Sequence, residues 1–120
     1  MKRLSPREED IMKVLWSLEK AFAKEIQEKL TEDLHYNTVS TIIRKLETKG
    51  FITHKSFGNT HQYFPKISRE EYRKFYMKNV SKFLFENSYK SIVSFFAKEE
   101  KISADELKEI LHLIENEKKQ

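Results

Sequence analysis

The hydrophobic pattern of this 120-residue chain changes its period abruptly at Gly50. Just before this glycine, four apolar residues recur at the i, i+3, i+4, i+7 spacing of one helix face: Val39, Ile42, Ile43 and Leu46. Just after it, residues 51–55 alternate as a strand does, and Gly58-Asn59 separates two runs that favour β-structure. Glycine suits the left-handed position that ends many helices. The pattern therefore predicts a helix, a tight stop and a β-hairpin in direct succession.

The segment before this helix predicts two more helices. Ser5-Pro6 and the acids that follow form a helix start, because serine caps, proline suits the first position and acids favour the positive end of the helix dipole. We expect the first helix at about residues 5–19 and a short extended piece at residues 20–22. A second helix then carries two spaced apolar residues, Ile26 and Leu30.

The segment after the hairpin reads as helical to its end. Two capping boxes, Ser68-x-x-Glu71 and Ser103-x-x-Glu106, predict the starts of two helices, since each serine and glutamate can satisfy the other's backbone N–H. The first of these helices reaches about Asn87, and a further helical piece follows at residues 89–100.

This order of elements predicts a mainly α fold with one small β-hairpin. Three helices followed by a hairpin match a winged helix-turn-helix domain, which we place at residues 1–67. The remaining residues, 68–120, form a predicted helical dimerisation domain. They carry many apolar side chains but are too few to bury them alone, and a symmetric second copy is the simplest cover.

The predicted dimer contacts are the apolar residues of these last helices. Their aromatic members also suggest a ligand pocket, but a dimer core is the favoured interpretation, because aromatic side chains commonly anchor interfaces. The predicted dimerisation residues are Tyr72, Phe75, Tyr76, Val80, Phe83, Ile92, Val93, Phe96, Leu107, Ile110, Leu111 and Ile114.

The polar face of the third helix has an unusual composition for a solvated surface. Opposite the apolar side lie Asn37, Thr41, Arg44 and Thr48, with Thr38, Ser40 and Lys45 on the flanks. Arginine pairs with guanine, asparagine with adenine, and a threonine methyl group can contact thymine. We interpret this face as the part that enters a DNA groove. The alternative is a winged helix that binds protein without touching DNA. A protein-binding face of the third helix is expected to expose aromatic or aliphatic residues.

The charge is concentrated near this helix. The whole chain has a net charge of +4, while residues 34–66 hold five basic residues and one acid, Glu47. A local basic segment is expected of a phosphate-binding surface, although chance clustering explains it equally well. On the hairpin, phosphate or minor-groove contacts and an ordinary polar tip are equal interpretations for four residues: His54, Lys55, Asn59 and His61. Of these four, we include Lys55 and Asn59 among the predicted DNA contacts.

Several classes of function are disfavoured by the residues that the chain lacks. Two glycines cannot build the usual phosphate-binding loops, and no nucleophile or zinc-protease motif occurs. The four histidines lack metal-ligand spacing and there is no cysteine, so we predict neither a metal nor another cofactor. The N-terminus lacks the apolar core of a signal peptide and no apolar run can span a membrane, which favours a cytoplasmic protein without membrane insertion.

Four stretches together resemble the BlaI/MecI/CopY family of penicillinase-type repressors, and the resemblance covers nearly the whole chain. They are LSPREEDIMKVLW, NTVSTIIRKLETKGFI, the hairpin end QYFP, and SIVSFFAKEEKISADELKEILHLIEN. The resemblance implies a homodimeric repressor that places its third helix in each half of a palindromic double-stranded DNA operator with TACA/TGTA-like half-sites. By position, it assigns the DNA contacts to Asn37, Thr38, Thr41 and Arg44, with Ser40 and Lys45 beside them.

The resemblance also implies a mode of release. The beta-lactam-responsive members are cut at an Asn-Phe bond by a membrane sensor peptidase system, and the matching bond here is Ser94-Phe95. Besides serine in place of asparagine at this bond, two departures are visible: the family often has lysine where Asn37 stands, and the cysteines of the copper-responsive members are missing, which excludes copper regulation of that kind. Cutting the C-terminal domain is expected to uncouple the two DNA-binding domains.

Overall fold

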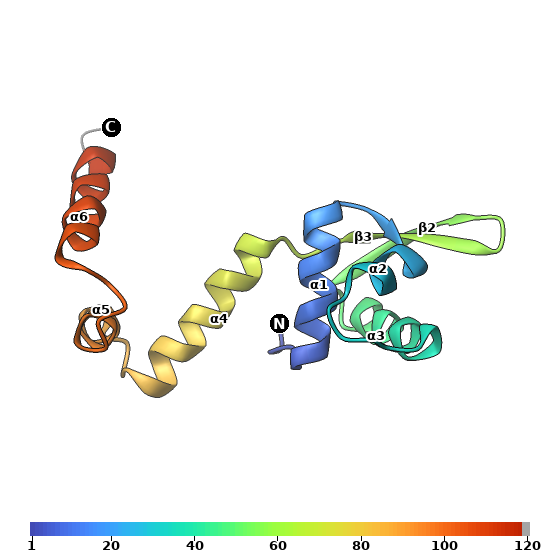
Figure 1. The fold of residues 1–120 in the computed structure, drawn as a ribbon, viewed down its shortest axis with the longest axis horizontal. Coiled ribbons are helices and arrows are strands. Elements are labelled where there is room, and N and C mark those ends of the chain that lie inside the picture. Colours follow the sequence, from blue (N-terminus) through green and yellow to red (C-terminus); the bar gives the residue numbers. More distant parts are fainter. Residues whose placement is uncertain (119–120) are drawn as a thin grey trace. The chain divides into compact units, whose positions relative to one another are not determined.

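A computed structural model describes residues 1–118 of the chain (Figure 1). Its nine elements are, in order, α1 (Pro6–Leu18), β1 (Ala21–Phe22), α2 (Ala23–Lys29), α3 (Tyr36–Thr48), β2 (Ile52–Phe57), β3 (Thr60–Pro65), α4 (Arg69–Leu84), α5 (Tyr89–Lys98) and α6 (Ala104–Lys118). The predicted fold class is confirmed, because the chain is mainly helical and begins as a winged helix.

The start of α1 forms as its sequence predicts. The Ser5 hydroxyl accepts from the Glu8 backbone N–H at 3.3 Å, while the Ser5 N–H donates to the Glu8 carboxylate at 2.9 Å. This capping box satisfies two donors that the first turn of a helix otherwise leaves free. The other end of α1 is closed by Glu19, which adopts a left-handed conformation with φ of 69°.

Gly50 ends α3 in the geometry that its position in the sequence predicts. Its φ is +85°, its N–H donates to the Glu47 carbonyl at 3.0 Å, and the Phe51 N–H donates to the Leu46 carbonyl at 2.9 Å. These two bonds define a Schellman motif, and both Phe51 and Leu46 are buried beneath it. The chain therefore turns sharply from the helix directly into β2.

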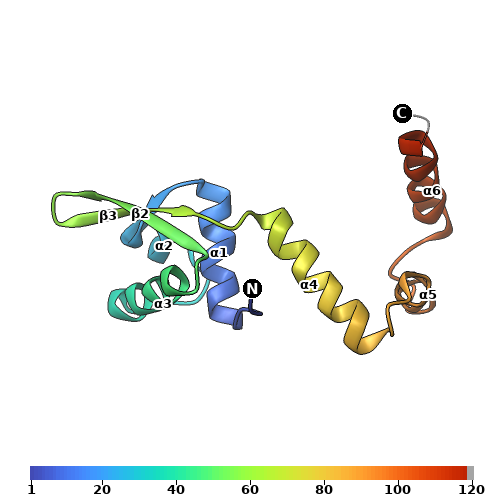
Figure 2. The same cartoon turned by 180° about the vertical axis from the view of Figure 1, so that it is seen from behind.

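The hairpin belongs to a three-stranded antiparallel sheet of order β1-β3-β2. The β2–β3 register runs from Ile52 opposite Pro65 to Phe57 opposite Thr60, and β1 pairs with β3 at Tyr63 and Gln62. Gly58 has φ of +60° while Asn59 does not have a positive φ, which fits a type II′ turn. Figure 2 shows the same hairpin from behind, extending past the helices of its unit.

The chain divides into two compact units, Met1–Tyr76 and the residues from Met77 onward. The predicted domain boundary at residues 67/68 lies at the start of α4, whereas the first unit continues into that helix. The reason is that Tyr72 is buried in the core of the first unit, and Phe75 and Tyr76 pack against this core.

The core of the first unit gathers apolar residues from every element between α1 and the start of α4. Its fully buried members come from α1, α2, the apolar face of α3 and the start of the hairpin. They include Ile11, Met12, Leu15, Ile26, Val39, Ile43, Leu46, Phe51 and Ile52. Trp16 closes one edge, where its indole N–H donates to the Ile67 carbonyl at 2.9 Å. The polar face of α3 is consequently held outward by a rigid apolar base.

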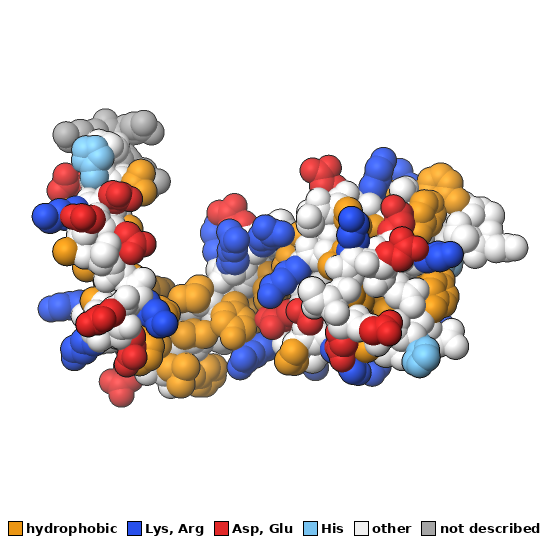
Figure 3. All heavy atoms as spheres, viewed as in Figure 1, with side chains coloured by type: hydrophobic (Ala, Val, Ile, Leu, Met, Phe, Trp, Pro, Cys, Tyr) orange, Lys and Arg blue, Asp and Glu red, His pale blue; other side chains and the backbone are white. Residues whose placement is uncertain are grey.

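The second unit, considered by itself, buries little of its apolar surface. Of its described hydrophobic side chains only Ile92 is buried, although Ser88 caps α5 and Ser103 with Glu106 forms the predicted capping box of α6. The exposed large side chains include Phe83, Leu84, Tyr89, Val93, Phe95, Phe96, Ile110, Leu111, Leu113 and Ile114. Figure 3 shows hydrophobic side chains gathered along α4.

Candidate nucleic-acid interface

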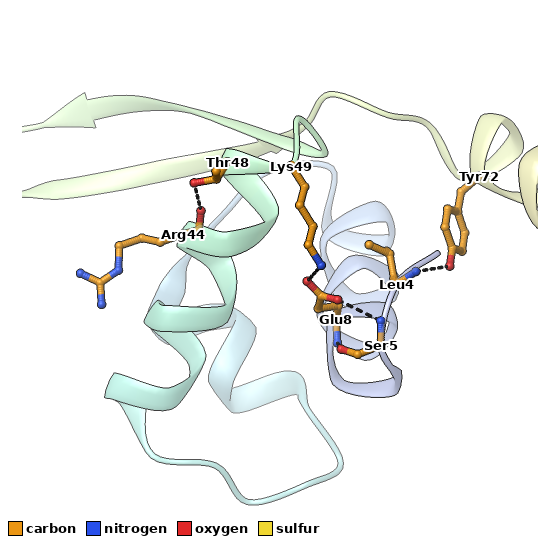
Figure 4. Close-up of polar contacts among 7 residues, drawn as sticks. All are labelled: Leu4, Ser5, Glu8, Arg44, Thr48, Lys49 and Tyr72. Atoms are coloured by element: carbon orange, nitrogen blue, oxygen red, sulfur yellow. Dashed lines mark hydrogen bonds and ion pairs between the residues drawn. The ribbon is translucent and has the colours of Figure 1, made fainter. Parts of the chain in front are cut away.

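The exposed face of α3 carries the side chains that the helix period predicts. Asn37, Thr41, Arg44 and Thr48 are exposed, while the opposite residues Val39, Ile43 and Leu46 are fully buried. In Figure 4 the Arg44 side chain extends from α3 on the side away from α1. Thr38 and Ser40 are half-buried on the two flanks, and Lys45 is exposed beside Thr41. Six of the eight predicted DNA contacts therefore share one helix surface.

Two threonines remain compatible with a helix because they bond to its backbone. The Thr41 hydroxyl donates to the Asn37 carbonyl at 2.8 Å, and the Thr48 hydroxyl donates to the Arg44 carbonyl at 3.0 Å. Such bonds to the preceding turn occupy the hydroxyl proton and leave the oxygen as an acceptor. The Arg44 guanidinium uses one of these oxygens, that of Thr41, at 3.3 Å. These bonds link the side chains of Thr41, Arg44 and Thr48 to the helix backbone or to one another.

An open hollow of about 620 Å³ lies between α3 and the start of α1. It is lined by Ser5, Arg7, Glu8, Asn37, Thr38, Thr41, Ile42, Lys45 and Lys49. Arg7 is held by Glu32, with its two nitrogens 3.1 and 2.8 Å from the carboxylate oxygens. Lys45 forms no ion pair within the described part of the chain, so its charge is available to a phosphate.

A partly buried ion pair joins α1 to the C-cap of α3 at the wall of this hollow (Figure 4). The Lys49 ammonium donates to the Glu8 carboxylate at 2.7 Å, and only 8% of the Glu8 side chain is exposed. Burial by itself raises the pKa of Glu8, but the Lys49 ammonium and the capping contacts with Ser5 outweigh it and hold the pKa below its ordinary value. Lys49 therefore serves chiefly to tie α3 to α1.

The hairpin presents two different faces. His54 pairs with Tyr63 across the strands and Ser56 pairs with His61, so these four side chains share one face, which we call the wing face. This face is turned toward α3, because the Glu47 carboxylate contacts His54. Glu47 also acts on Tyr63, whose pKa is raised first by burial and then by the charge of Glu47.

The two predicted hairpin contacts lie elsewhere. Lys55 alternates to the opposite face, where its ammonium stands 5.7 Å from the centre of the Phe64 ring. Asn59 is exposed at the turn. The structure therefore does not bring Lys55 or Asn59 together with the exposed face of α3, and it brings His54 and Glu47 there instead.

Sequence reasoning missed the contribution of α1 to this surface. Ser5, Arg7 and Glu8 were recognisable as a helix start, but no local pattern shows that this start faces Asn37 and Thr38. Tyr36 was missed as well, and it stands half exposed at the first position of α3. Of these residues, only Tyr36 could have been identified from the sequence, because it directly precedes Asn37 at the start of the polar face.

The predicted dimerisation residues differ in how far they are buried within the chain. Tyr72 is buried in the first unit and Phe75 and Tyr76 pack against its core, so these three have contacts within the chain. Ile92 is buried in the second unit, and Val80 and Leu107 are half-buried. The remaining members are exposed: Phe83, Val93, Phe96, Ile110, Leu111 and Ile114. The predicted cleavage bond joins half-buried Ser94 to exposed Phe95 inside α5.

Within the described residues, no group of three or more histidine, cysteine or acidic side chains is arranged to hold a metal ion. None of the described helices is both long and apolar enough to cross a membrane. The surface that remains is a polar, partly cationic helix face with a hairpin beside it, which is suited to a duplex and its phosphates.

Residues 4–116 match the family model described as penicillinase repressor. The chain belongs to the penicillinase repressor family. This confirms the family resemblance, and it makes the chain a transcriptional repressor and not an enzyme, because the family consists of such regulators.

Individual members of the penicillinase repressor family are similar over almost their full length. The methicillin resistance regulatory protein MecI of Staphylococcus aureus (strain N315) is 26% identical over 113 residues, which cover 92% of both chains. The penicillinase repressor of Bacillus licheniformis is 23% identical over 118 residues, covering 97% of this chain and 92% of the relative. DNA binding is typical of this family.

Proposed function

We propose that this repressor acts in the cytoplasm as a homodimer that binds a palindromic DNA operator, with α3 of each copy in the major groove of one half-site. The observation that carries the proposal is the exposed face of α3. It offers the amide of Asn37, the threonine side chains and the guanidinium of Arg44, whose pairing chemistry matches base edges and phosphates. The one acid of α3, Glu47, contacts His54 on the hairpin.

The cations beside this face support phosphate contacts. Lys45 is exposed and without an ion pair in the described residues, and it lines both the hollow beside α1 and a second open hollow along Arg44 and Thr48. Lys49 and Arg7 are engaged by acids and contribute less net charge. We assign base reading to Asn37, Thr41 and Arg44, and phosphate positioning to Thr38, Ser40 and Lys45.

The second unit supports the dimer. Phe83 and Leu84 are each 73% exposed, and Leu113 is 64% exposed. Large apolar side chains exposed in this number are unusual on a monomer and mark an interaction site. A second copy offers the same apolar surface and covers it by two-fold symmetry. Phe83, Val93, Phe96, Ile110, Leu111 and Ile114 are our proposed dimer contacts, together with Val80, Ile92 and Leu107.

The proposal also includes release by proteolysis at Ser94-Phe95, triggered by a membrane sensor peptidase system. Both of these parts rest on the family resemblance. The bond lies inside α5, so a protease must first unfold this helix locally. A cut there separates α6 from α4, and two half-site contacts that were linked become independent and weak.

Binding by fluorescence anisotropy tests this function. A TACA/TGTA palindrome and a scrambled duplex of the same length are compared over a salt series, and the stoichiometry is measured at saturation. We expect the palindrome to bind about 10³-fold more tightly than the scrambled duplex, with two chains per duplex. Equal and weak binding of both, lost at moderate salt, would instead mean either that the operator has a different sequence or that the rival function holds, a winged-helix module that binds protein and not DNA.

A further inference from the structure

The wing face carries no lysine or arginine in the described strands. Its positions along β2 and β3 are Ile52, His54, Ser56, His61, Tyr63 and Pro65, because the register places these residues on one side of the hairpin. Lys55, the cation of β2, belongs to the other face. Any positive charge that this face offers must therefore come from His54 and His61.

The two histidines form a closely packed pair. Their ring centres are 4.2 Å apart, and each ring is held by a second group. His54 is bound through Nδ1 by the Glu47 carboxylate of α3, and His61 Nδ1 lies 3.2 Å from the Ser56 hydroxyl. His61 is exposed and His54 is half-buried, so one ring is open to solvent while the other is tied to α3.

The charged groups around this pair are few. From α3, Glu47 contacts His54, and Arg44 and Tyr36 act on the neighbouring Tyr63 hydroxyl together with Glu47. From β1 the neighbours are Ala21 and Phe22, which are not ionisable, and on α2 the Glu25 carboxylate accepts from the Phe22 N–H. Of the groups of α3 that act on Tyr63, Glu47 carries the negative charge and Arg44 the positive one.

The pair lies beside the helix that we propose to bind DNA, since Glu47 of α3 contacts His54. The hairpin follows α3 directly, and both extend to the same side of the first unit (Figure 1). DNA that lies along the exposed face of α3 brings its backbone beside the wing face. Imidazole gains its proton between about pH 8 and pH 5, and a protonated ring can donate to a phosphate oxygen from its free nitrogen.

We infer that His54 and His61 form a phosphate site of the wing that binds DNA in its protonated state, so that operator binding takes up protons. The inference rests on the proposed function. Protonation turns a face that carries the charge of Glu47 into one with one or two additional positive charges. Two protonated rings repel each other at this separation. A phosphate bound on the solvent side of both rings offsets this repulsion. Affinity for the operator therefore increases as the pH falls.

The first measurement is the operator affinity of the full chain at about pH 8 and about pH 5.5, each over a salt series. We expect the dissociation constant to fall about tenfold at the lower pH, and the log–log salt slope to steepen by roughly one for each additional phosphate contact. The His54→Gln/His61→Gln double variant is expected to lose most of both changes. It keeps His35, the N-cap of α3, so any pH effect of that residue remains in the comparison.

Two further variants separate charge from structure. His112→Gln alters an exposed histidine of α6 and is expected to behave as wild type at both pH values. Glu47→Gln removes the negative charge in contact with His54, so less negative charge opposes a phosphate at the wing face. The variant is expected to raise operator affinity at about pH 8 and to shift the affinity–pH curve. A purely structural role of the pair does not produce this shift.

Histidine titrations by NMR on the wild-type chain provide a readout that does not depend on any variant folding. The midpoints of the His54 and His61 ring signals are expected to rise when the operator is bound. Unchanged midpoints, or a double variant that retains the wild-type pH and salt effects, would overturn the inference while leaving the repressor function intact. No binding to any operator-type duplex at either pH would refute the proposed function and this inference with it.

Discussion

At the scale of single residues, the stability of the first unit depends most on the hydrogen bonds and ion pairs of buried polar groups where two helices meet. Glu8 is the clearest example, because it caps α1, accepts from Lys49 of α3 and is almost inaccessible to solvent. Removing one member of such a pair leaves the other without compensation, which costs more than the pair itself contributes.

Glu8→Gln is expected to lower the free energy of unfolding by about 1–3 kcal/mol at neutral pH, because the amide keeps the cap but loses the charge that pairs with Lys49. Since the pKa of Glu8 is lowered in the folded chain, its contribution is fully present above the unfolded value of about 4.3 and is lost as the pH falls through the folded value. Urea unfolding over a pH series measures this. Glu32→Gln, in an exposed pair with Arg7, is the control and should change little; equal effects of both variants would contradict the assignment.

Tyr72→Phe is expected to destabilise the first unit by about 1–2 kcal/mol. The Tyr72 hydroxyl accepts from the buried Leu4 N–H at 3.0 Å and donates to the Glu9 carboxylate at 2.9 Å, so its loss leaves both without this partner. Tyr76→Phe is the matched control, because the Tyr76 hydroxyl accepts from the Arg3 side chain at 3.1 Å in an exposed hydrogen bond. Thermal unfolding compares them, and an equal loss in both would show that the hydroxyl of Tyr72 has no special role.

Arg44 and Lys45 are neighbours with different expected effects on DNA binding. Arg44→Ala should reduce discrimination between operator and scrambled duplex by about 1–3 kcal/mol, since it removes a base contact. Lys45→Ala should weaken binding to both duplexes alike and reduce the salt slope by about one, since it removes a phosphate contact. Anisotropy titrations on both duplexes separate the two effects. If both variants lost the same affinity for both duplexes, α3 would not be reading bases.

At the scale of elements, the junction between α3 and β2 decides how the recognition surface is built. The Schellman motif at Gly50 lets the chain leave the helix and enter the hairpin without a loop, and this holds the wing beside α3. The side-chain contact between Glu47 and His54 also joins α3 to β2.

Gly50→Ala is expected to cost about 1–2 kcal/mol, although nothing lies within 4 Å of the added Cβ. The cost arises from the φ of +85°, which an alanine adopts only with strain. Gly50→Asn is the control, because asparagine tolerates left-handed backbone, and it should cost less than alanine. Chemical denaturation gives both values. A loss with asparagine as large as that with alanine would mean that the conformation of the backbone is not the cause.

At the scale of the whole molecule, the division of the chain into two units has a direct consequence for truncation. A chain that ends after Tyr76 keeps Tyr72, Phe75 and Tyr76 on their core and is expected to unfold cooperatively, whereas one that ends after Ile67 exposes Trp16 and Phe51 and is expected to be much less stable. Circular dichroism melts compare the two. Equal stability would place the functional boundary before α4.

The chain that ends after Tyr76 is also expected to bind the operator more weakly than the full chain, by about 10²-fold or more, because it lacks the apolar surface that we propose joins two copies. Its affinity for a single half-site should be unchanged. Operator binding as tight as that of the full chain would rule out dimerisation as the source of affinity.

Local patterns were sufficient for the elements and for the polar face of α3. The period of Val39, Ile43 and Leu46, the glycine stop and the serine caps each act within a few residues, so they are legible in the sequence and recur in the structure. The tertiary structure alone decided what lies beside that face. It placed Glu8 against Lys49, turned Lys55 away from α3, set His54 on Glu47, and gave Tyr72 to the first unit and not to the exposed surface of the second. These outcomes depend on pairings between residues far apart in the chain, which packing and strand register select and which no local spacing encodes.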